Sequence, residues 1–393
     1  VPYHIFSKCF LLFLLAVTML GVYRLTRMLG AGRGLAGLAA LYLGISPALL
    51  NSTLWMWSEA AAYPWVVWIV VISVNLWRSV LERKAWGDVA GCSLALAVLF
   101  FLLTMVKAIA ATVMVLFMVP FYLTILYFAF KFQWGRLGRV LLSLGLVLGL
   151  MGAAVNGYKW LNWHYNGQYE VTDRGDFALY GNTVRRLQPM NRARVAQALL
   201  SVPRLGLCEK YYGQECVFWT YVMSDHIVEQ IQVNLDAANM PPAEKAKFFI
   251  SNAFKLMAQH PFQQTFFMLV ESSKMLFWEN RLYFVQYPAW LAHLYSRFSL
   301  IYTLCFTWAL LSLIGVVYAL FYIVGWFFRK DRAQEDKNLA VWLFAFWFIA
   351  CFSGLYSLFF IDMRYALPIA PLFVALFMGC LAGLGRRIRH NVR

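Results

Sequence analysis

Charged side chains are scarce in this sequence. Asp, Glu, Lys and Arg make up 13% of the 393 residues, whereas hydrophobic side chains make up 62%. An ordinary soluble domain is about 25% charged and about 45–50% apolar. A globule of this length has too little interior to cover so much apolar surface, and disordered or coiled-coil chains need more charge. The composition therefore excludes these classes and leaves a protein that crosses a membrane several times.

Clusters of metal-ligating side chains are also missing, because the 7 Cys and 6 His residues are scattered along the chain. Five cysteines lie in apolar runs and are interpreted as small core residues: Cys9, Cys92, Cys305, Cys351 and Cys380. Cys208 and Cys216 lie close together outside these runs. This pair is compatible with a disulfide on the oxidising side of a membrane, or with two free, buried thiols.

What the chain has in abundance is long apolar runs. A membrane-spanning helix needs about 20 such residues. Nine stretches qualify: 5–23, 34–51, 61–80, 87–106, 108–130, 139–158, 298–328, 338–360 and 366–385. Only Lys107 separates the fourth stretch from the fifth, so these two are expected to form a tight helical hairpin.

The basic residues predict how these spans are oriented. Half of the 34 Lys and Arg residues follow alternate spans: Arg24, Arg27, Arg33, Arg78, Arg83, Lys84, Lys131, Arg136, Arg139, Arg329, Lys330, Arg332, Lys337, Arg386, Arg387, Arg389 and Arg393. Basic connections face the cytoplasm. Most of the formal net charge of +16 is thus an orientation signal, and it does not favour a nucleic-acid partner.

This orientation places the first residue on the outer side of the membrane. The sequence begins with Val1 rather than Met. We therefore expect at least one helix upstream of Val1; a processed protein with an outer N-terminus is the alternative.

The spans divide the chain into three expected parts: an N-terminal membrane part of six helices at 1–158, an extracytoplasmic domain at 159–297 and a C-terminal membrane part of three helices at 298–393. Helical spacing of apolar residues and flanking prolines predict helices at 191–201, 243–259 and 263–278. The predicted fold class is all-α, a polytopic membrane helical bundle with a small, mainly helical outer domain.

A few polar residues are predicted near the outer edge of the bilayer, where ionisable groups are costly and often functional. They are Ser58, Glu59, Lys107, Tyr158, Lys159, Asp362, Arg364 and Tyr365. Each has a simpler explanation: a carboxylate at a helix N-terminus, a snorkelling or anchoring lysine, and an Asp–Arg pair. If they converge, their cations suit a phosphate ester, and the carboxylate suits a sugar hydroxyl or a base.

Four segments resemble the polyprenyl-phosphate-dependent glycosyltransferases of the GT-C superfamily, in particular bacterial relatives of the protein mannosyltransferases and the lipid A aminoarabinose transferases. The first segment is GISPALLNSTLWMWSEAAAYP, which contains Ser58 and Glu59. The second is LLTMVKAIAA, where Lys107 stands in place of the family's frequent Arg. The third begins at Asn156, where the family has an Arg-Asn-Tyr that leads into a Gly-rich, strand-like stretch; only Asn156 and Tyr158 correspond loosely. The fourth is IDMRYALPIAPLFVAL, which resembles the closing Arg-Tyr-x-x-Pro-x-x-Pro span.

The resemblance implies a GT-C fold and inverting transfer of a sugar from a polyprenyl-phosphate donor at the outer face of a bacterial inner membrane. It implies Arg364, Lys107 and Lys159 as ligands of the donor phosphate, and Glu59, Ser58, Tyr158 and Tyr365 as substrate-binding residues. The family's acidic general base would lie upstream of Val1, so these 393 residues alone are expected to be inactive. No cofactor is assigned, and a divalent metal is left open. The expected partners are the lipid-linked sugar, membrane lipids and an unidentified acceptor.

Three other functions remain as alternatives. A transporter usually carries internal repeats and broken helices; no repeat relates 1–150 to 298–393. A polysaccharide polymerase or ligase that uses lipid-diphosphate substrates would also carry a large outer segment with Arg. A non-enzymatic scaffold would not need cations at the outer edge of the bilayer.

Overall fold

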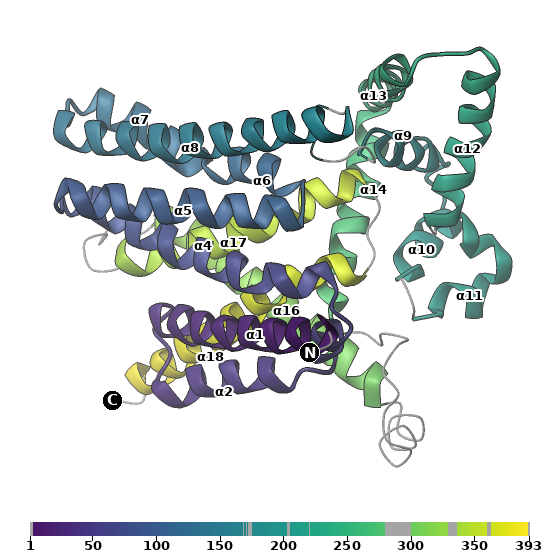
Figure 1. Cartoon of the computed structure of the whole chain (residues 1–393). Coiled ribbons are helices and arrows are strands. Elements are labelled where there is room, and N and C mark those ends of the chain that lie inside the picture. Colours follow the sequence, from purple (N-terminus) through teal and green to yellow (C-terminus); the bar gives the residue numbers. More distant parts are fainter. Residues whose placement is uncertain are drawn as a thin grey trace. The chain divides into compact units, whose positions relative to one another are not determined.

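The computed structural model of the chain describes residues 3–167, 169, 171, 175–202, 205–219, 221–279, 300–328, 336–359 and 363–391 (Figure 1). Within these ranges the chain is helical and contains no strand, which confirms the predicted all-α class. The chain divides into two compact units. The first unit holds Val1–Val171, Arg281–Phe352 and Leu367–Arg393, and the second holds Thr172–Asn280 and Ser353–Ala366.

Eight spans are long and apolar enough to cross a bilayer: α1 (Tyr3–Met28), α4 (Ser58–Leu81), α5 (Trp86–Val106), α6 with α7 (Ala110–Phe117 and Val119–Phe130), α8 (Trp134–Asn166), α16 (Leu300–Phe328), α17 (Asp336–Leu358) and η3 with α18 (Met363–Ile369 and Ala370–Asn391). The pair α2 (Arg33–Ile45) and α3 (Pro47–Leu54) becomes a ninth if the two are counted as one span. The described part of the chain therefore has the build of an integral membrane protein, as its composition predicted.

The expected continuous span at 34–51 is in fact broken, and its two halves meet at 47°. Proline lacks an N–H and forces the preceding residue out of helical geometry. Accordingly α2 ends at Ile45, and Pro47 opens α3 at its first turn. The hydroxyl of Ser46 accepts a hydrogen bond from the Leu49 N–H at 3.3 Å, which caps the new helix.

Within the first unit, α4 is the most enclosed of the N-terminal helices, since α1 and α5 pack against it and apolar side chains are buried along most of its length. Helix α5 in turn packs on α8, and α18 packs on α1 and α16. Large apolar side chains of α1, α7, α8 and α16 remain exposed, as expected of surfaces that face lipid.

The basic connections of the first unit gather at one end, called here the basic end, which comprises residues 28–33, 81–86 and 130–134 together with the end of α18 (Figure 1). Arginines link these connections by donating to backbone carbonyls. Arg136 bonds Leu81 O at 3.1 Å, and Arg386 bonds Gly30 O at 2.8 Å. The fourth basic connection, at 329–335, lies outside the described residues. The alternation of charge along the sequence thus agrees with the arrangement of the helix ends.

The second unit is built from short helices: α9 (Gly175–Arg185), α10 (Arg192–Leu200), α11 (Leu207–Tyr212), η1 (Gly213–Trp219), α12 (Tyr221–Ala237), α13 (Pro242–Gln259), α14 (Pro261–Lys274) and η2 (Met275–Phe277). The helices predicted at 191–201 and 243–259 are confirmed as α10 and α13. The one predicted at 263–278 is shorter than expected, because the chain tightens into η2 after Lys274.

The boundaries of the expected outer domain differ from those of the second unit. Helix α8 continues to Asn166, so residue 159 lies inside a helix, and the second unit also includes the end of α17 and the start of η3. Residue 297 lies outside the described residues. In the segment after Asn156, whose resemblance implied a strand-like stretch, most described residues lie in α8 and α9. The residues described between these helices, Gly167, Tyr169 and Val171, form no strand.

Gly315 lets α16 and α18 pack closely against each other. A Cβ atom on Gly315 would lie 2.8 Å from the backbone N of Phe377. Small residues of this kind let helices approach closely in a membrane, where the hydrophobic effect does not drive helix association.

We therefore expect Gly315→Leu to destabilise the protein by about 1–3 kcal/mol through overpacking. Gly325→Leu on the same helix is the matched control, because a Cβ there would meet nothing within 4 Å. The measurement is the thermal unfolding midpoint of the solubilised protein. Equal midpoints for the two variants would contradict the proposed close packing.

Candidate functional site

The residues Ser58 and Glu59 stand at the head of α4, after a sharp turn from α3. Met56 adopts a positive φ of 56°, and the Trp57 N–H donates to Ser52 O at 3.0 Å. This turn places Glu59 in the first helical turn of α4, where a carboxylate is favoured by the helix dipole. The carboxylate is nevertheless buried, with 4% of its side chain exposed.

Lys107 ends α5 and reaches this carboxylate. Its N–H donates to Leu103 O at 2.7 Å as the last bond of the helix, and its extended backbone turns the chain toward α6. Its Nζ lies 2.6 Å from Oε1 of Glu59, and only 11% of the Lys107 side chain is exposed. The Ser58 hydroxyl donates to the other carboxylate oxygen at 3.3 Å. One buried ion pair thus joins two of the segments that carry the family resemblance.

The pair argues against the simpler explanations of both residues. Lys107 does not extend to water, and Glu59 does not depend on the helix dipole alone. The two opposite charges largely cancel at this site, so that an incoming phosphate would have to compete with Glu59 for the Lys107 ammonium. An isolated charge buried here would be strongly destabilising, since desolvation of an ion costs several kcal/mol.

Polar residues of α3, which precedes α4 in the chain, are buried: Asn51, Ser52 and Thr53. Ser52 and Tyr63 hydrogen-bond to each other through their hydroxyls. The side-chain oxygen of Asn51 is buried and accepts no hydrogen bond from the described residues. Polar groups in an apolar setting need partners. The region of the first unit formed by α3 and the start of α4 is therefore suited to contact a polar group of a ligand.

Tyr158 and Lys159 lie about two turns before the end of α8 rather than at its end. Tyr158 is exposed, and Lys159 is half-buried with its Nζ 5.9 Å from the centre of the Tyr169 ring. The Tyr169 hydroxyl donates to Asn156 Oδ1 at 3.3 Å. The described contacts of Lys159 are therefore with this local aromatic group and not with the Glu59–Lys107 pair.

Arg364 and Tyr365 belong to the second unit and form a contact of their own. One guanidinium nitrogen of Arg364 donates to the Tyr365 hydroxyl at 3.1 Å, and the Tyr365 ring stacks on Tyr356 with centroids 5.0 Å apart. Both residues lie in η3, where Pro368 prevents a regular α-helix. Asp362, the partner of Arg364 in the simpler explanation, lies outside the described residues.

The structure joins Cys208 to Cys216 in a disulfide, with Cα atoms 5.7 Å apart, between α11 and η1. Among the described residues no group of three His, Cys, Asp or Glu side chains is placed to hold a metal ion.

A buried charge cluster in the second unit was not predicted. Its members are Arg185, Arg186, Glu271 and Lys274, and each is almost fully buried. Oε1 of Glu271 lies 3.2 Å from Arg185 and 3.1 Å from Lys274. These residues come from α14 and from the end of α9, and nothing in the local sequence distinguishes them from solvated charges. Only the tertiary contact between segments more than 80 residues apart brings them together.

Within this cluster Arg186 holds the C-terminal end of α17. It donates to the carbonyls of Ser357, Leu358 and Phe359, the last at 3.1 Å. Carbonyls in the last turn of a helix lack intrahelical partners, and a cation satisfies them. Burial lowers the pKa of Arg186 to about 9, so the guanidinium remains charged at neutral pH. The cluster thus has a structural role that accounts for its burial.

The chain matches no protein-family model, and neither the curated proteins nor the solved structures contain a significant match to it. The fold places it among all-α integral membrane proteins, and its function has to be inferred from its own residues.

We expect the Glu59–Lys107 pair to couple strongly. Glu59→Gln or Lys107→Met alone should cost about 3–5 kcal/mol, because each leaves an uncompensated charge buried, whereas the double variant should recover much of this loss. The free energy of unfolding in SDS measures the coupling. The exposed pair Glu82–Lys84, 3.7 Å apart, is the control and should couple by at most about 1 kcal/mol. Additive effects at 59 and 107 would refute the buried pair.

The buried cluster predicts an acid-sensitive second unit. Burial raises the pKa of Glu271, but Lys274, Arg185 and Arg186 outweigh this and hold it below its ordinary value. A lowered folded pKa means that the stabilisation is present above the unfolded pKa, about 4.3, and is lost as the pH falls through the folded value.

Hydrogen–deuterium exchange of α14, corrected for the intrinsic effect of pH, should therefore speed up in wild-type protein below about pH 4. Glu271→Gln should exchange faster at pH 7 and show a flatter acid response. Glu244→Gln, at an exposed position on α13, should behave like wild type. An identical acid response in Glu271→Gln would contradict the assignment.

Proposed function

We propose that the protein is a membrane glycosyltransferase that moves a sugar from a polyprenyl-phosphate donor to a lipid, glycan or protein acceptor. The proposal places the reaction at the end of the first unit opposite the basic end, on the periplasmic side of a bacterial inner membrane. The observation that carries it is the buried ion pair between Glu59 and Lys107. This pair joins two segments that, on sequence grounds, resemble the same family.

The neutral pair suits a donor whose charge grows during reaction. In inverting transfer the acceptor oxygen attacks the anomeric carbon, the bond from that carbon to the phosphate oxygen breaks, and the acceptor proton passes to a base. Negative charge then develops on the departing polyprenyl phosphate. Lys107 would exchange part of its contact with Glu59 for this phosphate as the charge appears, and stabilisation confined to the transition state accelerates the reaction.

Glu59 would at the same time accept a hydrogen bond from a sugar hydroxyl, with Ser58 as a further polar contact. The resemblance assigns Arg364 and Lys159 to the donor phosphate and Tyr158 and Tyr365 to the substrate. The acceptor's base is not assigned among the described residues.

A transporter is the second candidate, because the span formed by α2 and α3 is broken and carries the buried polar residues Asn51 and Ser52. Broken helices form substrate sites in transporters, near the middle of the bilayer. Here α3 has only 8 residues and leads directly into the head of α4, which favours a site at the edge of the span. A polymerase or ligase differs in its donor, which would be a lipid diphosphate.

The test measures sugar transfer by the full-length protein in membrane vesicles, with polyprenyl-phosphate and polyprenyl-diphosphate donors compared. Transfer should require the monophosphate donor. Lys107→Met and Arg364→Ala should each lower kcat by about 100-fold or more, as loss of a transition-state charge contact does, and Lys107→Arg should retain part of the activity.

Lys131→Gln, at the exposed C-terminal end of α7, is the matched control and should leave kcat unchanged. Thermal midpoints separate lost catalysis from lost folding. Wild-type turnover in Lys107→Met, or transfer only from the diphosphate donor, would overturn the proposal. Movement of the intact donor across the membrane without transfer would favour the transporter.

A further inference from the structure

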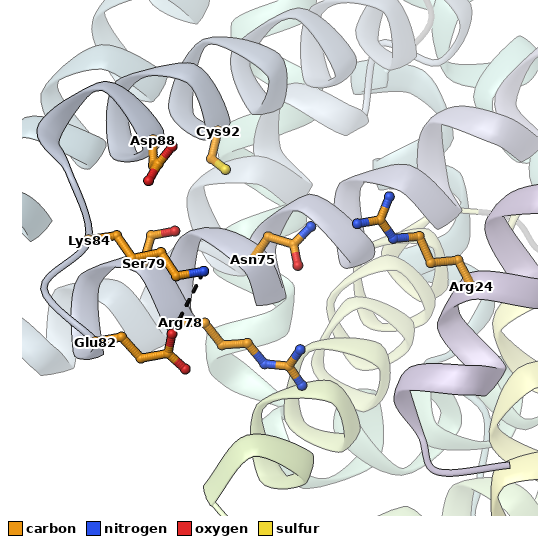
Figure 2. A pocket seen from close by; sticks show the side chains of 8 residues that line it. All are labelled: Arg24, Asn75, Arg78, Ser79, Glu82, Lys84, Asp88 and Cys92. Atoms are coloured by element: carbon orange, nitrogen blue, oxygen red, sulfur yellow. Dashed lines mark ion pairs between the residues drawn. The ribbon is translucent and has the colours of Figure 1, made fainter.

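A polar pocket of about 450 Å³ lies in the first unit between α1, α4 and α5 (Figure 2). Three cations and two carboxylates line it: Arg24, Arg78, Lys84, Glu82 and Asp88. Arg24 lies near the end of α1, Arg78 in the last turn of α4 and Asp88 in the first turn of α5. The pocket is therefore at the basic end, at the opposite end of α4 from Glu59, and it is separate from the proposed transfer site.

The inner wall of the pocket carries polar side chains that have no hydrogen-bond partner among the described residues. Asn75 and Ser79 lie one turn apart on α4, and neither side chain makes a hydrogen bond to the described residues. Figure 2 shows Asn75 between Arg24 on one side and Asp88 and Cys92 on the other. Uncompensated amide and hydroxyl groups on a membrane helix are costly, so a polar ligand or water in the pocket is expected to satisfy them.

The charges around the pocket differ in their ion pairing among the described residues. Lys84 and Glu82 form an ion pair at 3.7 Å that is 48% and 40% exposed and therefore weak. The Arg24 guanidinium lies 5.8 Å from the centre of the Trp68 ring and contacts no carboxylate among the described residues. Asp88 likewise forms no ion pair with a described residue. The pocket thus presents a cation and a carboxylate that are both available to a ligand.

This arrangement selects among ligands by charge. A simple anion such as inorganic phosphate would meet two carboxylates, and a simple cation would meet three basic side chains. A ligand that carries a phosphate and an ammonium a few bonds apart matches both kinds of group. The stronger contact is the one between a guanidinium and the phosphate, because it can be bidentate.

The location of the pocket indicates that this ligand is a lipid. It lies where apolar helices end, which is the level of the headgroups in a bilayer. Leu20, one turn before Arg24 on the same face of α1, is 65% exposed and offers an apolar surface to an acyl chain.

We propose that the pocket between α1, α4 and α5 binds the headgroup of an aminoalkyl phospholipid. The phosphate lies against Arg24 and Arg78, the ammonium lies toward Asp88, and Asn75 and Ser79 donate to the phosphate oxygens. The site is independent of the transferase proposal, because it shares no residue with it and lies at the other end of the bundle.

Native mass spectrometry of the purified full-length protein tests the headgroup. With phosphatidylethanolamine, phosphatidylglycerol and phosphatidylcholine supplied at equal concentration, the wild-type protein should retain phosphatidylethanolamine at least fivefold over the others. Arg24→Gln should lower this retention by about tenfold, and Asp88→Asn should abolish the preference over phosphatidylglycerol. Lys131→Gln, also at the basic end but outside the pocket, should retain lipid like wild type. Equal retention by Arg24→Gln and Lys131→Gln would overturn the proposal.

Cys92 provides a second readout, since its thiol lines the pocket. Alkylation of Cys92 by N-ethylmaleimide, followed on its own peptide, should be at least threefold slower in phosphatidylethanolamine nanodiscs than in phosphatidylglycerol nanodiscs. Soluble phosphoethanolamine and inorganic phosphate, added to the phosphatidylglycerol discs, should give no protection. Protection by either soluble compound equal to that by the lipid would overturn the lipid assignment, as would equal rates in the two kinds of disc. The variants Arg24→Gln and Asp88→Asn replace exposed side chains, so both are expected to fold.

Discussion

The structure depends on one constraint: in a setting nearly free of water, each buried polar or charged group needs a partner within the protein or from a ligand. Helices meet this requirement for the backbone, except at their ends. In this chain arginines complete several of those ends, as Arg136 does for α4 and Arg186 for α17. The same requirement explains why Glu59 and Lys107 meet at 2.6 Å, 48 residues apart in sequence.

This constraint also separates structural charges from candidate functional ones. The cluster of Arg185, Glu271 and Lys274 is enclosed and internally compensated, so it is interpreted as a structural core of the second unit. The Glu59–Lys107 pair is compensated too, but it stands at a helix terminus. On the preceding helix α3, the side-chain oxygen of Asn51 is buried and accepts no hydrogen bond from the described residues. Charge that is compensated at rest and can be redistributed to a phosphate is what the proposed transfer needs.

The basic end contrasts with this site. There the charges around Asn75 are many and partly exposed, and Arg24 and Asp88 form no ion pair with a described residue. This suits recognition of a zwitterionic headgroup more than catalysis. One helix, α4, carries polar residues of both regions at its two ends. The two proposed sites would follow from the same requirement, that polar and charged groups in a membrane need partners. One site would hold a lipid-linked substrate, and the other a structural lipid.

Local pattern was enough to predict the spans, the basic end and the helices α10 and α13, because hydrophobic runs, positive charges and proline positions act over a few residues. Ser46–Pro47 is a local signal too, and it marks the break in the second span. The break was not predicted, because the apolar residues on both sides of Ser46–Pro47 form what looks like one continuous run. The sequence could not predict which polar side chains contact one another. The pairing of Glu59 with Lys107, the burial of Arg185 and Arg186, and the pocket around Asn75 each join segments far apart in the chain. Sequence alone therefore determined that the chain crosses a membrane and which of its helix ends are basic, whereas tertiary packing decided which charges are compensated, because only packing sets the distance between them.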